Sequence, residues 1–290
     1  MTIRARAINR GRGTPGLWSV LGKVLMYLVL IGGAISSLFP FYWMISSSFK
    51  ITNEIMQVPP NIIPTSLVLD NYHYVFSTMN VWQTFLNSLI VSGSTVLLNA
   101  LFSGMVAYAL VKLVFPGSKL LFMLVLAFMM IPGQLMTVPL FLQINRMGLL
   151  GTYPAMFLPG AVSSFSIFLF RQAMLSVPND YIDAAKIDGS SHIYIFFRII
   201  MPLIVPTLIT VIIINFFWSW NSYLWPMMVT VGKDHMATMP VALDRYRTLH
   251  AVRWGATMAG CVLTAAPIMV LYLILQRQFI ESIALSGIKG

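Results

Sequence analysis

Side chains able to do chemistry are scarce in this sequence, and several of them gather in one short segment, residues 177–206. Only 9% of the 290 residues are charged. In this segment the carboxylates of Asp183 and Asp188 can accept hydrogen bonds from a partner protein or cap local backbone groups. Residues 179–187 have the length of a short helix, and Gly189 is well placed to turn the chain after it. We therefore expect two short helices joined at Gly189.

The common catalytic and metal-binding patterns are missing from the sequence. There is no G-x-x-x-x-G-K-[ST] loop for nucleotide phosphates, no H-E-x-x-H pair and no G-x-S-x-G turn. The four histidines are scattered, and His192 is interpreted as a surface residue of a helix. A single cysteine, Cys261, allows neither a disulfide nor a cysteine metal cluster. We predict no catalytic residue, no metal site and no cofactor in this chain.

The composition indicates a polytopic membrane protein. Hydrophobic residues make up 58% of the chain, and the charged fraction is well below the roughly 25% of soluble domains. The formal net charge of +10 fits the excess of Lys and Arg on the cytoplasmic side of membrane proteins better than a nucleic-acid partner. The basic start is followed by a long apolar stretch without a small-residue cleavage site, so we expect a retained first span rather than a signal peptide.

Six stretches are long enough to cross a bilayer, which takes about 20 residues. These predicted spans are 24–46, 85–111, 120–142, 153–170, 203–228 and 256–276. Residues 1–23 form a predicted leader, 24–276 a single domain of six spans, and 277–290 a tail. Pro132 and Pro139 should kink the third span.

The basic residues predict the orientation. With the N-terminus in the cytoplasm, 12 of the 18 Lys and Arg residues lie inside with four acids, a net charge of +8. The other six lie outside with four acids, a net charge of +2. Because Lys and Arg accumulate on the cytoplasmic side, both termini and segment 177–206 are expected there.

Uncharged polar residues recur on one face of the second span, at Ser88, Ser92, Thr95, Asn99 and Ser103. One interpretation is packing, since small and hydroxyl residues let membrane helices approach and hydrogen-bond. The other is a pathway for a hydroxyl-rich solute, with aromatic side chains as stacking surfaces. The candidate pathway residues are Ser92, Asn99, Gln134, Asn215, Trp218 and Asn221.

No charged residue lies at the centre of a predicted span. Such residues usually mark ion or proton relays, so their absence counts against an ion-coupled secondary transporter. It also leaves a membrane-embedded enzyme with little chemistry.

The run D-A-A-K-I-D-G-S-S at 183–191 resembles the EAA loop of ABC-importer permeases, whose core pattern is E-A-A-x-x-x-G. Asp183 stands where the family usually has Glu. The likeness extends over nearly the whole chain, with S-S-F-K at 47–50, S-W-N-S-Y-L-W-P at 219–226 and a terminal G-I-K-G. These runs are similar to the MalG-like membrane subunit of carbohydrate importers.

The resemblance implies partners and residue roles. It implies a second, MalF-like permease, two ATP-binding subunits that hold ATP and Mg, and a periplasmic or extracellular solute-binding protein. The implied ATPase-docking residues are Asp183, Ala184, Ala185, Asp188, Gly189, Ser190 and Pro202. Gly287 and Lys289 would contact the ATPase from the tail, although a frayed terminus is an alternative. Arg245 and Arg247 would contact the binding protein, unless their loop is simply solvated.

From the sequence and the resemblance, we expect an all-α integral membrane protein with six transmembrane helices, the permease fold of type I ABC importers. It would lie in the bacterial inner membrane, bind no nucleic acid and form half of a pathway for a carbohydrate, most simply an oligosaccharide. A permease for glycerol phosphate or an acidic sugar is the alternative. An ion-coupled secondary transporter is a further one.

Overall fold

The computed structural model describes residues 17–113, 115–249 and 253–287, and every regular element in this part of the chain is helical. The first half holds α1 Leu17–Ser48, α2 Thr52–Ile55, α3 Asp70–Thr78, α4 Val81–Lys112, α5 Ser118–Met129, η1 Gly133–Met136, α6 Thr137–Arg146, α7 Tyr153–Phe157 and η2 Leu158–Gly160. The second half holds α8 Ser164–Leu175, α9 Asp180–Ile187, α10 His192–Ile195, η3 Phe196–Ile200, α11 Met201–Leu203, α12 Val205–Trp220, α13 Leu224–Val229, η4 Asp234–Met236, α14 Met239–Leu249 and α15 Trp254–Gly287.

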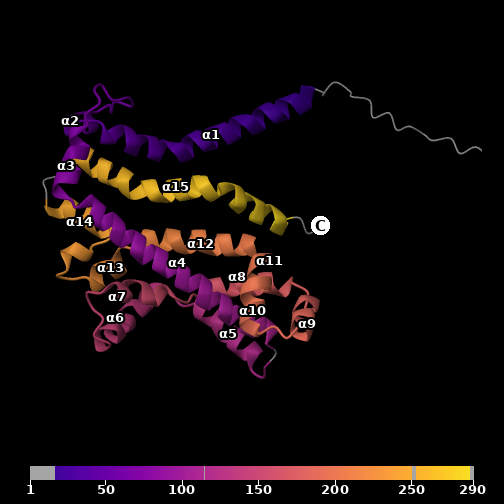
Figure 1. Ribbon diagram of the computed structural model, residues 1–290. Helices are drawn as coiled ribbons and strands as arrows, with labels where there is room; N and C mark the ends of the chain where they lie inside the picture. The colour runs from indigo at the N-terminus through magenta and orange to yellow at the C-terminus, as the bar shows by residue number, and fades with distance from the viewer. Residues whose placement is uncertain (1–16, 114, 250–252, 288–290) are drawn as a thin grey trace, which may run out of the picture.

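The long helices lie side by side in the order α1, α15, α12, α4 and α8 (Figure 1). α4 is at the centre and packs against both α8 and α12. The start of α1 and the end of α15 point toward the end of the molecule that carries α9, whereas α2, α3, α13 and α14 lie at the other end (Figure 1). The start of α1, the end of α15 and segment 177–206 therefore lie at the same end of the described structure.

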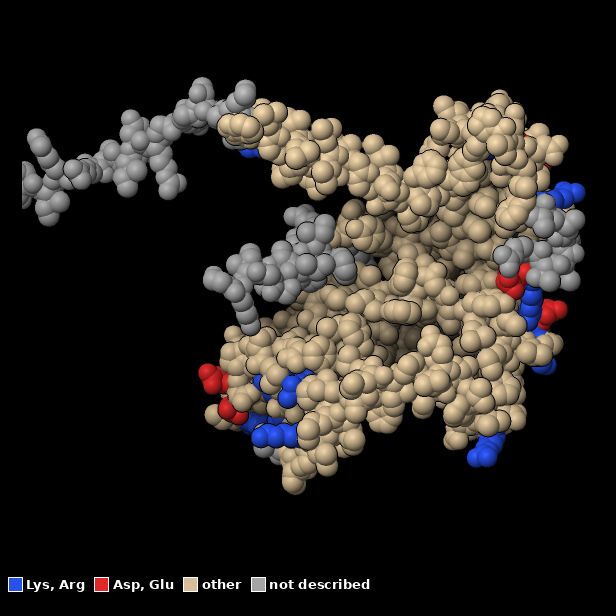
Figure 2. Space-filling model, turned by 180° about the vertical axis from the view of Figure 1, so that it is seen from behind, with Lys and Arg blue, Asp and Glu red and all other residues tan. Residues whose placement is uncertain are grey.

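Within the described residues, three helices are long and apolar enough to cross a membrane, and three bent helix pairs raise the number of candidate spans to six. The expected all-helical membrane fold is confirmed. Acidic and basic side chains gather toward two ends of the molecule, with a broad uncharged belt between them (Figure 2). Such a belt is what the hydrocarbon core of a bilayer requires.

The third predicted span does not run straight through. α5 and the following η1–α6 pair are bent by 98°, and Pro132 lies at the break. Pro139 does not add a second kink, because it is the third residue of α6, where a backbone N–H has no helical acceptor. The proline effect predicted from the sequence is therefore real but comes from one of the two prolines.

The fifth predicted span, 203–228, is divided as well. α12 ends at Trp220, and α13 starts as a separate helix at Leu224. The α10–α11 region meets α12 at a bend of 86°. α12 has only 16 residues, or about 24 Å at 1.5 Å per residue. The helix that holds the last predicted span continues beyond it, because α15 runs to Gly287 and makes most of the predicted tail helical.

Asn87 joins three parts of the fold at the start of α4. Its side chain is fully buried. The Nδ2 atom donates to the carbonyl oxygens of His235 at 2.8 Å and Ala237 at 2.9 Å. The Oδ1 atom accepts from Tyr153 Oη at 2.7 Å and Gln83 Nε2 at 2.9 Å. All hydrogen-bonding positions of this amide are thus used.

We expect Asn87→Ala to lower the free energy of unfolding by about 1–3 kcal/mol, because it leaves buried partners without a hydrogen bond. Thermal unfolding of the purified protein in detergent measures the loss. Asn221→Ala is the matched control, since that exposed amide donates only to Phe217 O in its own helix. The control should stay within about 0.5 kcal/mol of the wild type. Equal losses in the two variants would contradict the role of Asn87.

Candidate functional site

Segment 177–206 folds as two helical pieces joined at Gly189, as the sequence predicts. α9 ends in a Schellman motif, in which Ser190 N donates to Ala185 O at 2.9 Å and Gly189 N donates to Lys186 O at 2.9 Å. Gly189 has a φ of +79°, a conformation that costs glycine nothing and strains other residues. The next helix is capped by Ser191, whose Oγ accepts from Tyr194 N at 3.3 Å.

The two faces of α9 have different surroundings. Ile182 and Ala185 are buried in a core cluster that also contains Phe170 and Ile195. The predicted docking residues Asp183, Ala184, Asp188 and Gly189 are exposed, as is Pro202, the second residue of α11, and Ser190 is half-buried. Ala185 therefore packs on the chain's own core, and the surface open to a partner excludes it.

The exposed face of α9 also carries apolar side chains that the motif does not include. Ile187 is 87% exposed and Tyr181 is 52% exposed. They lie close in sequence to the exposed carboxylates of Asp183, which is within the same helix, and of Asp188, which is its C-cap. A surface that combines large apolar side chains with a few carboxylates is suited to docking on a protein. We call the surface formed by Tyr181, Asp183, Ala184, Ile187 and Asp188 the α9 surface.

Two side chains from the end of α4 hold this segment in place. Lys112 is buried, and its Nζ donates to Val177 O at 2.7 Å and to Asn179 Oδ1 at 2.8 Å. Tyr108 is also buried, and its hydroxyl is 2.9 Å from His192 Nδ1. These contacts lie on either side of α9. The α9 surface is therefore fixed to the central helix of the bundle.

Close packing adds to these anchors. The ring of Tyr108 meets that of Phe196 edge to face, with centroids 5.7 Å apart. A Cβ placed on Gly104 would lie 3.3 Å from the Phe196 ring, so a side chain there would press on the ring. Phe196 begins the π-helical turn η3.

The polar face of α4 lies inside the chain. Ser88, Ser92, Thr95, Asn99 and Ser103 are all buried. Three of them bond backbone groups in distant parts of the chain. Ser88 Oγ accepts from Met239 N at 2.7 Å, Asn99 Nδ2 donates to Gly160 O at 2.9 Å, and Ser103 Oγ accepts from Ser163 N at 3.2 Å. These bonds support the packing interpretation for the residues that make them.

The other candidate pathway residues have varied environments. Asn215 is half-buried and donates to Ser166 Oγ at 3.1 Å. Gln134 is exposed near the 98° bend. Trp218 and Asn221 are exposed and border an apolar cavity of about 840 Å³ between α1, α12 and α15. The structure does not bring the six candidates together at one site, and their contact with a solute stays a prediction.

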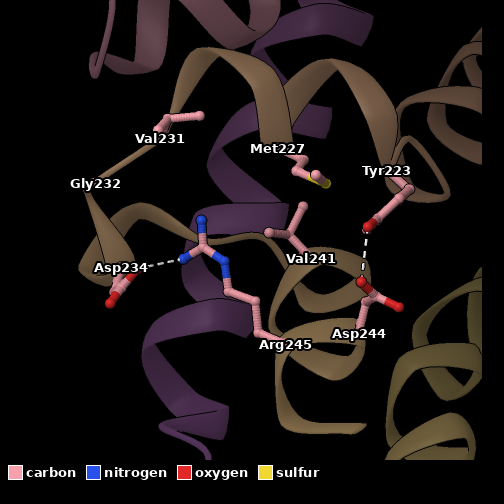
Figure 3. Close-up of a pocket in the computed structure, with 8 residues that line it drawn as sticks. All are labelled: Tyr223, Met227, Val231, Gly232, Asp234, Val241, Asp244 and Arg245. Atoms are coloured by element: carbon pink, nitrogen blue, oxygen red, sulfur yellow. Dashed lines mark hydrogen bonds and ion pairs between the residues drawn. The ribbon is translucent and has the colours of Figure 1, made fainter. Parts of the chain in front are cut away.

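A smaller cavity of about 430 Å³ lies at the end opposite α9, between α13 and α14 (Figure 3). Arg245 Nη1 pairs with Asp234 Oδ1 at 2.6 Å, and Tyr223 donates to Asp244 Oδ2 at 2.7 Å. Arg245 is thus already neutralised by a carboxylate. Arg247 lies in α14, but its side chain is outside the described residues.

Of the two tail residues, Gly287 is the last residue of α15, and Lys289 falls outside the described residues. Within the described ranges, no three His, Cys, Asp or Glu residues come close enough to hold a metal ion.

Comparison with known proteins identifies the family. Residues 99–284 match the model of the binding-protein-dependent transport system inner membrane component. The chain belongs to this family of ABC-importer permeases. This confirms the resemblance to MalG-like carbohydrate permeases, and it makes the protein a multi-pass membrane component.

Similar proteins cover almost the whole chain. The arabinooligosaccharides transport system permease protein AraQ of Halalkalibacterium halodurans is 37% identical, over 92% of this chain and 98% of its own length. The probable starch degradation products transport system permease protein AmyC of Thermoanaerobacterium thermosulfurigenes is 32% identical, over 92% and 98%. The fold is similar to a chain of a bacterial ABC transporter for import of the acidic polysaccharide alginate, with a TM-score of 0.80, 21% identity and coverage of 91% and 98%.

The anchoring residues were not evident from the sequence. Lys112 looks like an ordinary cytoplasmic cation at the end of a span, and Tyr108 like an apolar core residue. Spacing gave no signal either, because Tyr108 is five residues beyond Ser103 and so leaves the pattern of three- and four-residue steps that marks the polar face of α4. Their partners lie more than 60 residues away, so only the folded chain reveals the bonds.

We expect Lys112→Met to loosen the start of α9, because the carbonyl of Val177 and the amide of Asn179 lose a charged donor. A lost bond of about 1–2 kcal/mol corresponds to roughly 5- to 30-fold faster local opening. Hydrogen–deuterium exchange of the amides in Asp180–Ile187 measures it. Lys119→Met, which removes an exposed lysine close in the sequence, should leave the exchange unchanged. Unchanged protection in Lys112→Met would show that the anchor is dispensable.

Proposed function

We propose that this chain is the membrane-spanning permease subunit of an ATP-driven ABC importer for an oligosaccharide, and that the α9 surface docks on a separate ATPase. The α9 surface carries this proposal. It is exposed, it combines apolar and acidic side chains, and it is fixed to α4 by Lys112. The sequence has no nucleotide-binding loop of its own, so the energy for transport must come from a partner.

In this proposal the α9 end of the bundle faces the cytoplasm of a bacterial cell, and both chain ends lie on that side. The excess of basic residues assigned to this side supports the orientation. Two ATP-binding subunits hold ATP and Mg, one beneath this chain and one beneath a second, MalF-like permease. Each permease forms half of the pathway, which opens to the two sides in turn.

The opposite end, with α13 and α14, would meet a solute-binding protein. Family membership supports this partner, since its description names dependence on a binding protein. Arg245 and Arg247 are the proposed contact residues on this chain. Because Arg245 is paired with Asp234, its main effect would be to hold the loop between α13 and α14 in shape.

The solute class rests on the relatives. AraQ and AmyC are named for arabinooligosaccharides and for starch degradation products, which favours a neutral oligosaccharide. An acidic sugar or glycerol phosphate is the second candidate, because Arg245 and Arg247 are among the basic residues assigned to the outer side. The pairing of Arg245 with Asp234 weakens that argument. An ion-coupled mechanism is disfavoured by the lack of charged residues at the span centres.

Docking is tested in the assembled complex. Asp183→Ala and Gly189→Trp should reduce both co-purification of the ATPase and transport per ATP hydrolysed. The first removes a carboxylate from the α9 surface, and the second strains its positive-φ turn. Gly232→Trp is the matched control for ATPase binding, since Gly232 also has a positive φ and open space around it, at the other end. Wild-type binding and uptake in both α9 variants would refute the docking assignment.

The solute is tested by ATPase stimulation in the reconstituted importer with its binding protein. Neutral oligosaccharides, including arabino-oligosaccharides, should stimulate hydrolysis more than uronic-acid oligomers or glycerol phosphate do. Stronger stimulation by the acidic compounds would favour the second candidate. Uptake by this chain alone, driven by a proton or sodium gradient without ATP, would instead support a secondary transporter.

A further inference from the structure

The connection between α1 and α3 exposes an unusual number of apolar side chains. Val58 is 91% exposed, Leu67 is 76% exposed and Ile63 is 74% exposed. Met56 and Ile62 are exposed as well, at 61% and 57%. So many exposed apolar side chains on one short connecting loop call for a partner surface.

The same connection exposes no charge. Between Lys50 and Leu69 the only ionisable side chains are those of Lys50 and Glu54, and both are buried. Lys50 Nζ donates to Asn61 O at 2.6 Å, and Glu54 Oε1 accepts from Thr65 N at 2.8 Å. The two charges therefore turn inward and hold the loop, while its outer surface is neutral and largely apolar. A loop made for water, or for a charged protein surface, would show the opposite arrangement.

The loop also folds back along α1 instead of extending away from it. The carbonyl oxygen of Ile62 accepts from Tyr42 Oη at 3.0 Å, Ser46 Oγ at 2.9 Å and Lys50 Nζ at 3.3 Å. Ser46 is in the last turn of α1 and has a short side chain, so Ile62 must lie level with that turn. Val68 N donates to Phe49 O at 2.9 Å and closes the loop.

The last turn of α1, with which Ile62 is level, corresponds to the edge of a bilayer. α1 carries the aromatic residues Phe39, Phe41, Tyr42 and Trp43, and such residues gather at membrane interfaces. Ser46 lies four residues beyond Tyr42, about 6 Å at 1.5 Å per residue. The interfacial layer is about 5–7 Å thick on each side. In Figure 1 the loop around α2 projects on the side of α1 that faces away from α15.

We propose that residues 56–67 form an interfacial lipid anchor, whose apolar side chains enter the boundary between headgroups and acyl chains at the end opposite α9. The anchor is preformed, because Lys50, Glu54 and Ser46 fix its backbone. It ties the outer end of α1 to the bilayer surface, which suits a helix that is largely exposed along its length. This inference rests on the membrane-spanning fold and not on the identity of the solute or the ATPase.

The experiment uses the assembled transporter in lipid nanodiscs. Val58→Cys and Ile63→Cys are made in a Cys261→Ser background, with cysteine-free partner subunits, and labelled with the fluorophore NBD. Lipids that carry a nitroxide near the start of the acyl chain should reduce the fluorescence about twofold or more, as expected for side chains within the acyl boundary. Val231→Cys is the matched control, since Val231 is 76% exposed in the connection after α13, also at the end opposite α9, and should stay unquenched.

Two results would overturn the anchor. Labels at 58 and 63 that are quenched by a water-soluble nitroxide, and not by the lipid-borne one, would place the loop in water. Labels shielded from both quenchers only when the second permease or the binding protein is present would place the loop against that protein. Normal assembly and ATPase activity of the labelled complexes exclude misfolding as the cause of either result.

Discussion

The structure depends on one constraint: backbone groups freed where a helix breaks inside a membrane must find partners within the protein. Among the described residues, three of the six candidate spans are broken. The polar face of α4 supplies partners at one of these breaks, where Asn99 and Ser103 bond the backbone at the junction of η2 and α8. Asn87 and Ser88 bond the backbone around η4 and the start of α14. One long helix thus satisfies backbone groups both at a broken span and in a connection between spans.

The same helix links the two ends of the molecule. At one end Asn87 and Ser88 hold the connection into α14, and at the other Lys112 and Tyr108 hold segment 177–206. The separation from Asn87 to Lys112 is 25 residues, or about 37 Å of helix. A displacement of the α9 surface would therefore move a rigid element that reaches the opposite side. Movement of α4 as a rigid body would then couple the α9 surface to the opposite end of the molecule directly.

Much of this fold could be predicted from residue types. The spans follow from their apolar length, the turn after α9 from Gly189, and the polar face of α4 from its spacing. The bend at Pro132 follows from the proline itself. The break after Trp220 was harder to predict, because an apolar stretch looks the same whether it is straight or bent. Ala184 and Ala185 are indistinguishable in the motif, yet only the fold determines that Ala185 faces the core. Lys112 was missed because its acceptors are brought to it by tertiary structure alone.

The exposure of α1 has a consequence for biosynthesis. This helix is long and strongly apolar, and its most apolar stretch is not buried against the rest of the described chain. It can therefore leave the translocon and become stable in lipid before any other part of the chain exists. The 16-residue α12 cannot, because it is short and its Asn215 depends on Ser166 of α8. Insertion of this protein into the bilayer would thus begin with α1, which needs no other helix. Helices such as α12 would become stable in the bilayer only after the helices they pack against have been inserted.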